Sequence, residues 1–75
     1  MDKLKIEILK ALDEEEGVTL LELKSKLKGI RYSEKELKSN LKKLEEQNLI
    51  EERHFNDRVD YSLEHKGYKL LHSKF

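Results

Sequence analysis

The amino-acid sequence predicts a small α+β domain, with three helices before a two-stranded hairpin and one helix after it. Three observations support this expectation: leucines recur at helical spacing, helix-capping patterns begin at Thr19 and Ser33, and Asn56-Asp57 separates two β-prone segments. The 75 residues are expected to form a single domain, residues 1–75. A domain of this size buries only about 60 to 65% of its unfolded surface, which leaves no room for a deep substrate pocket.

Composition narrows the class of protein. Charged residues make up 43% of the chain, mostly lysine and glutamate, and there is no proline or cysteine. This balance is typical of hyperthermophile proteins and hints at a thermophilic, archaeal source. The absence of cysteine excludes disulfides, thiolate zinc sites and cysteine nucleophiles. The N-terminal residues lack the apolar run of a signal peptide or membrane span, which predicts a cytoplasmic protein without membrane contact.

The first helix is expected to begin after Asp2 as its cap and to run to about Asp13. The acidic residues 13–16 lie near the negative end of this helix, so the helix should stop there and Gly17 should turn the chain. Val18 is then expected in a short extended segment. The residues placed on the inner stripe are Met1, Leu4, Ile8, Ala11 and Leu12, with Ile6 and Leu9 on the other side.

Two capping boxes predict the next two helices. Thr19 to Glu22 has the T-x-x-E spacing and Ser33 to Glu36 has S-x-x-E, so each hydroxyl and each glutamate can satisfy a free backbone N–H. The second helix is expected to end at Lys28 before Gly29. The third is expected to end before Asn48. The inward leucines are Leu20, Leu23 and Leu27 in the second helix and Leu37, Leu41 and Leu44 in the third.

The hairpin is expected to begin at Leu49-Ile50 and to turn at Asn56-Asp57, because both tip residue types tolerate positive φ. This register places Arg53 opposite Asp60 on one face and Ile50 opposite Leu63 on the other. A short last helix then follows. Its expected inner stripe is Tyr68, Leu71 and Phe75, with Leu70 on the opposite side.

This order of elements is that of a winged helix-turn-helix, with a three-helix core, a two-stranded wing hairpin and a C-terminal helix. The stretches LKKLEEQNLIEER and RVDYSLEHKGYKLL resemble the pattern L-x-x-L-E-x-x-G-L-I, a wing, then Y-x-L-T-x-x-G-x-x-L of MarR-type and PadR-type transcriptional regulators. The resemblance covers about residues 33–71. Asn48 stands in place of the usual glycine, and Glu64 in place of the threonine that caps the last helix.

The resemblance implies a DNA-binding transcriptional regulator built on this fold. Small winged-helix proteins of archaea and of archaeal viruses are also similar in size and lysine content. Because the matching residues concern packing and turns, the resemblance does not indicate an operator sequence or an effector.

Positive charge is concentrated in the centre of the chain. Residues 24–43 contain eight basic and two acidic residues, although the whole chain has 16 of each. This segment covers the end of the second helix, the turn and most of the third helix, which is the surface that a helix-turn-helix presents to DNA. The sequence therefore predicts sequence-selective binding of double-stranded DNA, with the recognition helix Ser33 to Gln47 in the major groove.

Helical periodicity sorts the side chains of the third helix. With Leu37 toward the core, the side chains near the solvent-facing pole are Lys35, Ser39, Lys42 and Glu46, and the first three could reach base edges or phosphates. Four others flank them and are expected to hold the DNA backbone: Arg31, Ser33, Lys38 and Lys43.

The wing, Arg53 to Arg58, is expected to contact the minor groove or the backbone, because arginine is attracted to a narrow minor groove. Arg58 is the preferred candidate. Arg53 has Asp60 as an expected partner, so it could instead hold the hairpin together.

Alternatives to DNA binding stay open. Exposed lysines on a helix are often solvated charge without a partner, and the basic segment could bind an acidic protein, as the overall neutrality and the acidic residues beside the wing would allow. The histidines His54, His65 and His72 do not have metal-ligand spacing on a helix, and no phosphate loop or nucleophile motif is present. We therefore expect no enzyme activity, cofactor, metal or small-molecule ligand.

Surplus apolar residues predict a homodimer through the terminal helices. The residues assigned to this interface are Ile6, Leu9, Leu70 and Phe75. A two-fold dimer would place two recognition helices about 34 Å apart, one turn of DNA. Scattered apolar residues are also normal on monomer surfaces, so this alternative stays open.

Overall fold

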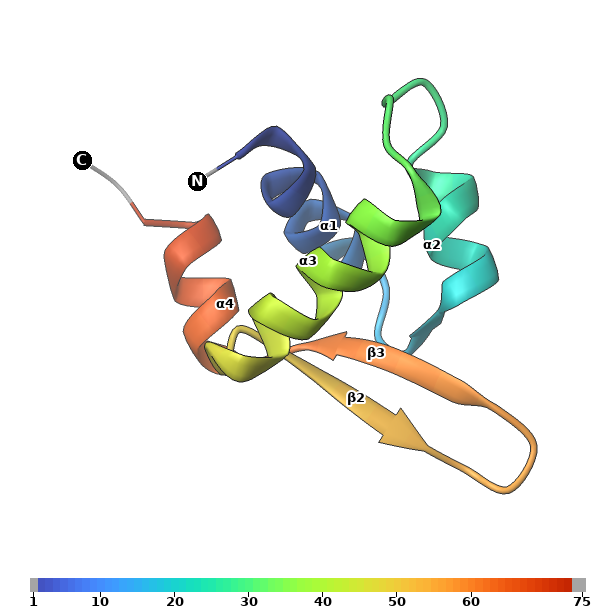
Figure 1. Cartoon of the computed structure of the whole chain (residues 1–75). Coiled ribbons are helices and arrows are strands. Elements are labelled where there is room, and N and C mark those ends of the chain that lie inside the picture. The colour runs from blue at the N-terminus through green and yellow to red at the C-terminus, as the bar shows by residue number, and fades with distance from the viewer. Residues whose placement is uncertain (1, 74–75) are drawn as a thin grey trace.

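The computed structural model describes residues 2–73 and confirms the predicted winged-helix order. Figure 1 shows the helices gathered on one side and the hairpin projecting from them. The elements are α1 (Lys3–Glu14), β1 (Val18–Thr19), α2 (Leu20–Lys26), α3 (Glu34–Glu46), β2 (Ile50–His54), β3 (Val59–Leu63) and α4 (His65–Leu71). The short strand β1 pairs with β3, so the wing belongs to a three-stranded antiparallel sheet of order β1-β3-β2.

Helix starts lie where the capping signals predict them. The Asp2 carboxylate accepts the Lys5 N–H at 3.0 Å. Both capping boxes form: Thr19 Oγ1 accepts the Glu22 N–H at 3.2 Å, and Ser33 Oγ accepts the Glu36 N–H at 3.0 Å. Each device satisfies N–H groups that the first turn of a helix leaves without a partner.

Three residues of positive φ end the first three helices. Gly17 (φ 73°), Gly29 (φ 89°) and Asn48 (φ 62°) adopt the left-handed conformation that favours glycine and asparagine. Helix α2 nevertheless ends at Lys26, two residues earlier than predicted, because residues 27–29 already form the turn. The Ile30 N–H donates to the Leu27 carbonyl at 3.1 Å in this turn.

The hairpin has the predicted register, with Arg53 opposite Asp60 and Ile50 opposite Leu63. The Phe55 N–H donates to the Arg58 carbonyl at 2.8 Å and closes the turn at the tip. The reason given for the tip was wrong, however, because Asn48 is the one non-glycine residue of positive φ in residues 2–73. The pairs along the strands therefore set the register without a turn of positive φ at Asn56-Asp57.

The core lies between α1, α2, α3 and the sheet. Its buried side chains are Leu4, Ile8, Leu9, Ala11, Leu12, Val18, Leu23, Leu27, Leu37, Leu41, Leu44, Leu49 and Ile50. The predicted position of Leu9 outside the core stripe was wrong, since only 1% of this residue is exposed. Helix α1 contacts α2, α3, α4 and β3, so its buried face is wider than one stripe.

Helix α4 differs from its predicted orientation. Leu71 packs against the core as expected, but Tyr68 is 50% exposed. The centroid of the Tyr68 ring lies 4.3 Å from that of the His72 ring. Gly67 takes the inner position, where it is buried against the carbonyl of Leu49. The Glu64 side chain, which stands in place of the capping threonine of the PadR-type pattern, makes no capping hydrogen bond. Phe75 lies outside the described residues.

Candidate nucleic-acid interface

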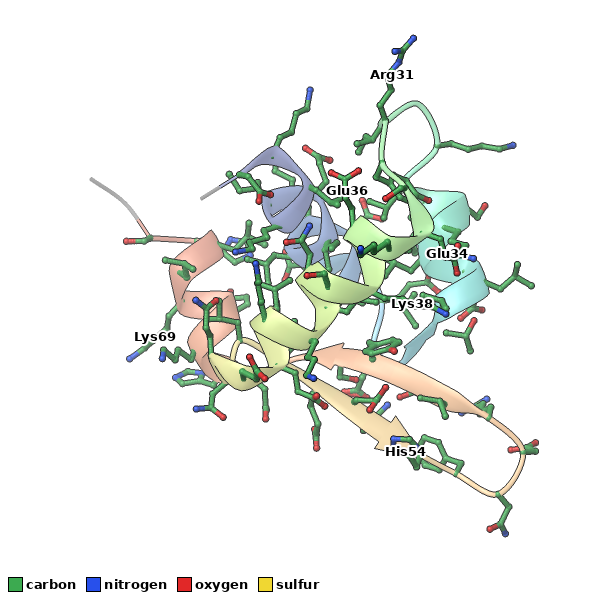
Figure 2. The ribbon with its side chains drawn as sticks, viewed as in Figure 1. Arg31, Glu34, Glu36, Lys38, His54 and Lys69 are labelled. Carbon is green, nitrogen blue, oxygen red and sulfur yellow. The ribbon has the colours of Figure 1, made fainter. Side chains whose placement is uncertain are left out.

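Helices α2 and α3 and the turn between them form the helix-turn-helix. The buried leucines of α3 are three or four residues apart, at Leu37, Leu41 and Leu44, so its other side faces solvent. The predicted contact residues of α3 and the turn are all exposed: Arg31, Ser33, Lys35, Lys38, Ser39, Lys42 and Lys43. Figure 2 shows Arg31 projecting from the end of the turn, away from the other helices.

Only part of this positive charge is neutralised within the chain. Lys26 forms ion pairs with Glu14 at 3.2 Å and with Glu15 at 2.7 Å, which direct it toward the end of α1. Lys24 and Lys38 pair with Glu34, at 2.7 Å and 3.8 Å. In the described part of the chain, no ion pair involves the four other predicted cations, Arg31, Lys35, Lys42 and Lys43.

The acidic side chains in the first turn of α3 have local roles. Glu36 accepts the Ser33 N–H at 3.0 Å as part of the capping box, and Glu34 pairs with lysines. Negative charge here also complements the positive end of the helix dipole. The Ser33 oxygen accepts the Glu36 N–H, so this predicted DNA contact already serves as the helix cap.

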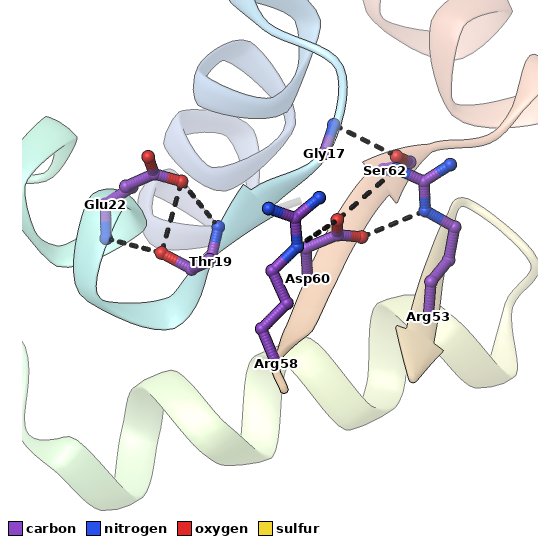
Figure 3. A network of polar contacts seen from close by, with 7 residues as sticks. All are labelled: Gly17, Thr19, Glu22, Arg53, Arg58, Asp60 and Ser62. Carbon is purple, nitrogen blue, oxygen red and sulfur yellow. Dashed lines mark hydrogen bonds and ion pairs between the residues drawn. The ribbon is translucent and has the colours of Figure 1, made fainter. Parts of the chain in front are cut away.

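Both wing arginines lie against a buried carboxylate. Asp60 has no solvent-exposed surface, and Arg53 contacts it through Nε at 2.9 Å and Nη2 at 3.4 Å. The hydrogen bond to Asp60 raises the pKa of the Arg53 guanidinium above its usual value. Arg58 lies 3.9 Å from the same carboxylate, and Figure 3 shows the two arginines approaching Asp60 from either side.

The ring of Phe55 completes this cluster. The guanidinium carbons of Arg53 and Arg58 lie 5.6 Å and 5.2 Å from the ring centroid, within the range of cation–π attraction. Gly17, in the bend just before β1, also lies close to the cluster, and its N–H donates to Ser62 Oγ at 3.2 Å. A Cβ at Gly17 would lie 2.8 Å from Arg53 Nη2, the end of a flexible side chain, so the positive φ is the stronger reason for glycine at this position.

The opposite face of the sheet meets α3. Tyr61 lines a hollow of about 470 Å³ together with Lys38, Leu41 and Lys42. Its hydroxyl donates to Glu52 at 3.0 Å, and burial together with this carboxylate raises the pKa of Tyr61 to about 12. Because neighbouring residues of a strand point to opposite faces, Asp60 and its arginines lie on the sheet face away from α3. Arg58, at the tip, is the wing arginine with the greater exposure.

The residues assigned to a dimer meet between α1 and α4. Ile6, Leu9, Leu70 and Leu71 line an apolar hollow of about 270 Å³, with Lys10 at its edge. Leu70 is 44% exposed, whereas Leu9 belongs to the core and forms the floor of the hollow. The fourth assigned residue, Phe75, is outside the described residues.

The helix-turn-helix contains basic residues that were not among the predicted contacts, including Lys24 of α2 and the exposed Lys28 of the turn. Lys24 of α2 shares the Glu34 carboxylate with Lys38 of α3. Its place in the basic segment was the available sequence signal, but a helical wheel of α3 cannot show a side chain that comes from α2.

The described residues contain neither a metal site nor a membrane-spanning helix. In residues 2–73, no three histidine or acidic side chains are grouped so that they could hold a metal ion. Within the same range, none of the helices is sufficiently long and apolar to cross a lipid bilayer.

Comparison with protein-family models and with curated protein sequences gives no match. Among solved structures, the fold is similar to that of a PadR family transcription regulator from Clostridium difficile, with a TM-score of 0.84. The two chains are 22% identical, and the match covers 93% of this chain and 80% of the other. The likeness to PadR-type proteins that the sequence suggested is therefore confirmed for the fold, which is a winged helix-turn-helix.

Proposed function

We propose that the protein binds double-stranded DNA through the outer face of α3 and acts as a transcriptional regulator. The observation that carries the proposal is a set of exposed cations on the helix-turn-helix that form no ion pair within residues 2–73, among them Arg31, Lys35, Lys42 and Lys43. A helix of this kind lies in the major groove and its lysines neutralise phosphates. The similar crystal structure, which is of a transcription regulator, supports the same class of function.

Selectivity for sequence would come from few side chains. Ser39 lies on the exposed face between Lys35 and Lys42, where its hydroxyl can donate to or accept from a base edge. The lysines contribute mainly affinity, since phosphate contacts carry no sequence information. In the wing, Arg58 is the proposed minor-groove or backbone contact, whereas the two hydrogen bonds from Arg53 to Asp60 support a role for Arg53 in holding the hairpin together.

DNA binding is tested by fluorescence anisotropy of a labelled mixed-sequence duplex at increasing salt. The triple variant Lys35→Ala, Lys42→Ala, Lys43→Ala is expected to bind at least tenfold more weakly at low salt. Its slope of log affinity against log salt should be shallower by up to about 2.7, or about 0.9 for each lost phosphate contact.

A matched control removes the same charge from helices outside the helix-turn-helix. The variant Lys10→Ala, Lys66→Ala, Lys69→Ala changes three lysines of α1 and α4 and is expected to retain most of the salt dependence. Equal slopes for the two triple variants would contradict the orientation proposed for α3. Absence of binding by the unaltered protein at low salt would contradict DNA binding itself.

A second candidate function is contact with another protein. One hollow is bordered by acidic side chains at the end of α1 and the base of the wing, namely Asp13, Glu14, Glu15, Glu16, Glu51 and Glu64. This surface lies outside the proposed DNA interface, so a basic partner could use it. The salt series separates the two functions, because only DNA binding requires the lysines of α3. That the protein has no enzyme activity stays a prediction.

We also propose that two copies associate through the hollow between α1 and α4. Leu70 and Ile6 supply its apolar rim, and a second copy would cover both. Leu70→Glu is expected to weaken such a dimer by about 3 kcal/mol, roughly a hundredfold, because two symmetry-related leucines lose their burial. Sedimentation equilibrium measures the change.

Leu21→Glu is the control, since this leucine is 79% exposed on α2 and does not line the hollow between α1 and α4. The control should leave the dimer intact. If the unaltered protein remains monomeric at all concentrations, the proposed dimer is contradicted, whereas the DNA-binding proposal is unaffected.

A further inference from the structure

Glu34 is the first residue of α3, and its carboxylate lies between lysines from both helices of the helix-turn-helix. Lys24 Nζ of α2 lies 2.7 Å from Oε1 and 3.0 Å from Oε2. Lys38 Nζ, one turn along α3, lies 3.8 Å from Oε2. Figure 2 shows Glu34 and Lys38 on the part of α3 that is close to α2. One carboxylate therefore brings two ammonium groups toward a single point.

The contacts that hold this carboxylate are those that a DNA phosphate would use. Both groups are anionic, and both present oxygen atoms as hydrogen-bond acceptors to ammonium donors. The hydrogen bond from Lys24 lowers the pKa of Glu34, so the carboxylate is charged at neutral pH. In the absence of DNA, Glu34 thus occupies a phosphate-like position at the edge of the proposed interface.

The ion pairs are weak enough to be replaced. The Lys24 and Glu34 side chains are 36% and 53% exposed, and the Lys38 side chain is more exposed still. Exposed pairs of this kind contribute little to stability because water and salt screen them. The buried leucines Leu23 and Leu37 already pack α2 and α3 into the core, so the helices do not depend on Glu34 for their arrangement.

We propose that Glu34 is an internal competitor for phosphate, and that on DNA binding a backbone phosphate takes its place between Lys24 and Lys38. This inference rests on the proposed DNA-binding function and adds two residue roles to it. Lys24 becomes a phosphate contact. Glu34 lowers the affinity for any duplex, because it must give up its lysines and then lies near a polyanion.

The test is the neutral, nearly isosteric substitution Glu34→Gln, measured on the same mixed-sequence duplex. Affinity at low salt is expected to rise about threefold to fivefold, the scale of an exposed ion pair. The melting temperature should change little. Glu51→Gln is the matched control, because it removes the same charge from an exposed position at the base of the wing and should change affinity less.

A double-mutant cycle tests the role of Lys24. In a Lys24→Ala background, the gain from Glu34→Gln is expected to shrink to less than about twofold, because the released ammonium group is missing. An unchanged or lower affinity of Glu34→Gln, in a protein that otherwise binds DNA, would overturn the competitor role. An equal gain with and without Lys24 would overturn the shared phosphate position. No binding by any of these proteins would instead overturn the proposed function.

Discussion

Replacing Gly67 with alanine is expected to lower the free energy of unfolding by about 2 to 3 kcal/mol, the usual scale of an overpacked core. The sign of this change in stability distinguishes helix propensity from packing. Alanine is the better helix former by about 1 kcal/mol, and Gly67 lies within α4. Helix propensity alone therefore predicts stabilisation. Packing predicts the opposite.

The expected destabilisation by Gly67→Ala comes from the close approach of α4 to the connection between α3 and β2. A Cβ at Gly67 would overlap the Leu49 carbonyl oxygen and lie 2.9 Å from Leu63 Cδ1. A backbone carbonyl cannot move aside as a flexible side chain can, and this one also accepts the Glu64 N–H at 3.0 Å. To admit the methyl group, α4 would have to move away from the body of the domain.

Thermal unfolding measures the effect, which corresponds to a loss of roughly 10 to 20 °C in melting temperature for a domain of this size. Gly29→Ala is the control, because Gly29 has positive φ but nothing within 4 Å of the added Cβ. Its cost should be only the conformational one, about 1 to 2 kcal/mol. A Gly67→Ala protein that melts at a higher temperature than the unaltered protein would show that α4 can move away at no cost.

Asp60→Ala is the second substitution with a large expected effect, a loss of about 1 to 3 kcal/mol in the free energy of unfolding. The carboxylate is completely buried and accepts two hydrogen bonds from Arg53. Its removal leaves the guanidinium at the base of the wing without its partner and opens a gap beside Gly17. The wing should loosen first, because the cluster joins β2 and β3 to the chain before β1.

Hydrogen exchange of the β2 and β3 amides, together with thermal unfolding, measures this loosening. Arg58→Ala provides the comparison, since Arg58 is largely exposed and 3.9 Å from the carboxylate. That variant is expected to keep the melting temperature while weakening DNA binding. If Arg58→Ala and Asp60→Ala destabilise the protein equally, the assignment of Arg53 as the structural arginine and Arg58 as the DNA contact is wrong.

Much of the fold could be predicted because its signals are local. A capping box involves residues three positions apart, and a left-handed turn depends on a single residue. Thr19 and Ser33 therefore indicate helix starts, and Gly29 a helix end, independently of how the elements pack. The register of the hairpin was also predictable, since Arg53 and Asp60 are complementary across a short loop. The exposed face of α3 follows from its leucines in the same way.

Part of the site could not be predicted, because it depends on contacts between segments that are distant in sequence. Lys24 and Glu34 meet only because the fold places the start of α3 beside α2, and Lys26 lies at the end of α1 because it pairs with Glu14 and Glu15. A sum of charges over residues 24–43 counts these lysines as equivalent to Lys42, although the structure pairs some and leaves others open to solvent. Charge in a sequence shows where a basic surface can form, but packing determines which cations remain free.

The sequence alone predicts where the helices and the hairpin begin, which leucines of α2 and α3 point inward and which segment carries the positive charge, since these properties depend on neighbours within about one helical turn or one hairpin. The packing of the elements against one another determines that Leu9 is buried, that Gly67 rather than Tyr68 faces the core, and that β1 joins the sheet. Each of these depends on a surface supplied by another element, and that surface exists only after the elements have packed together.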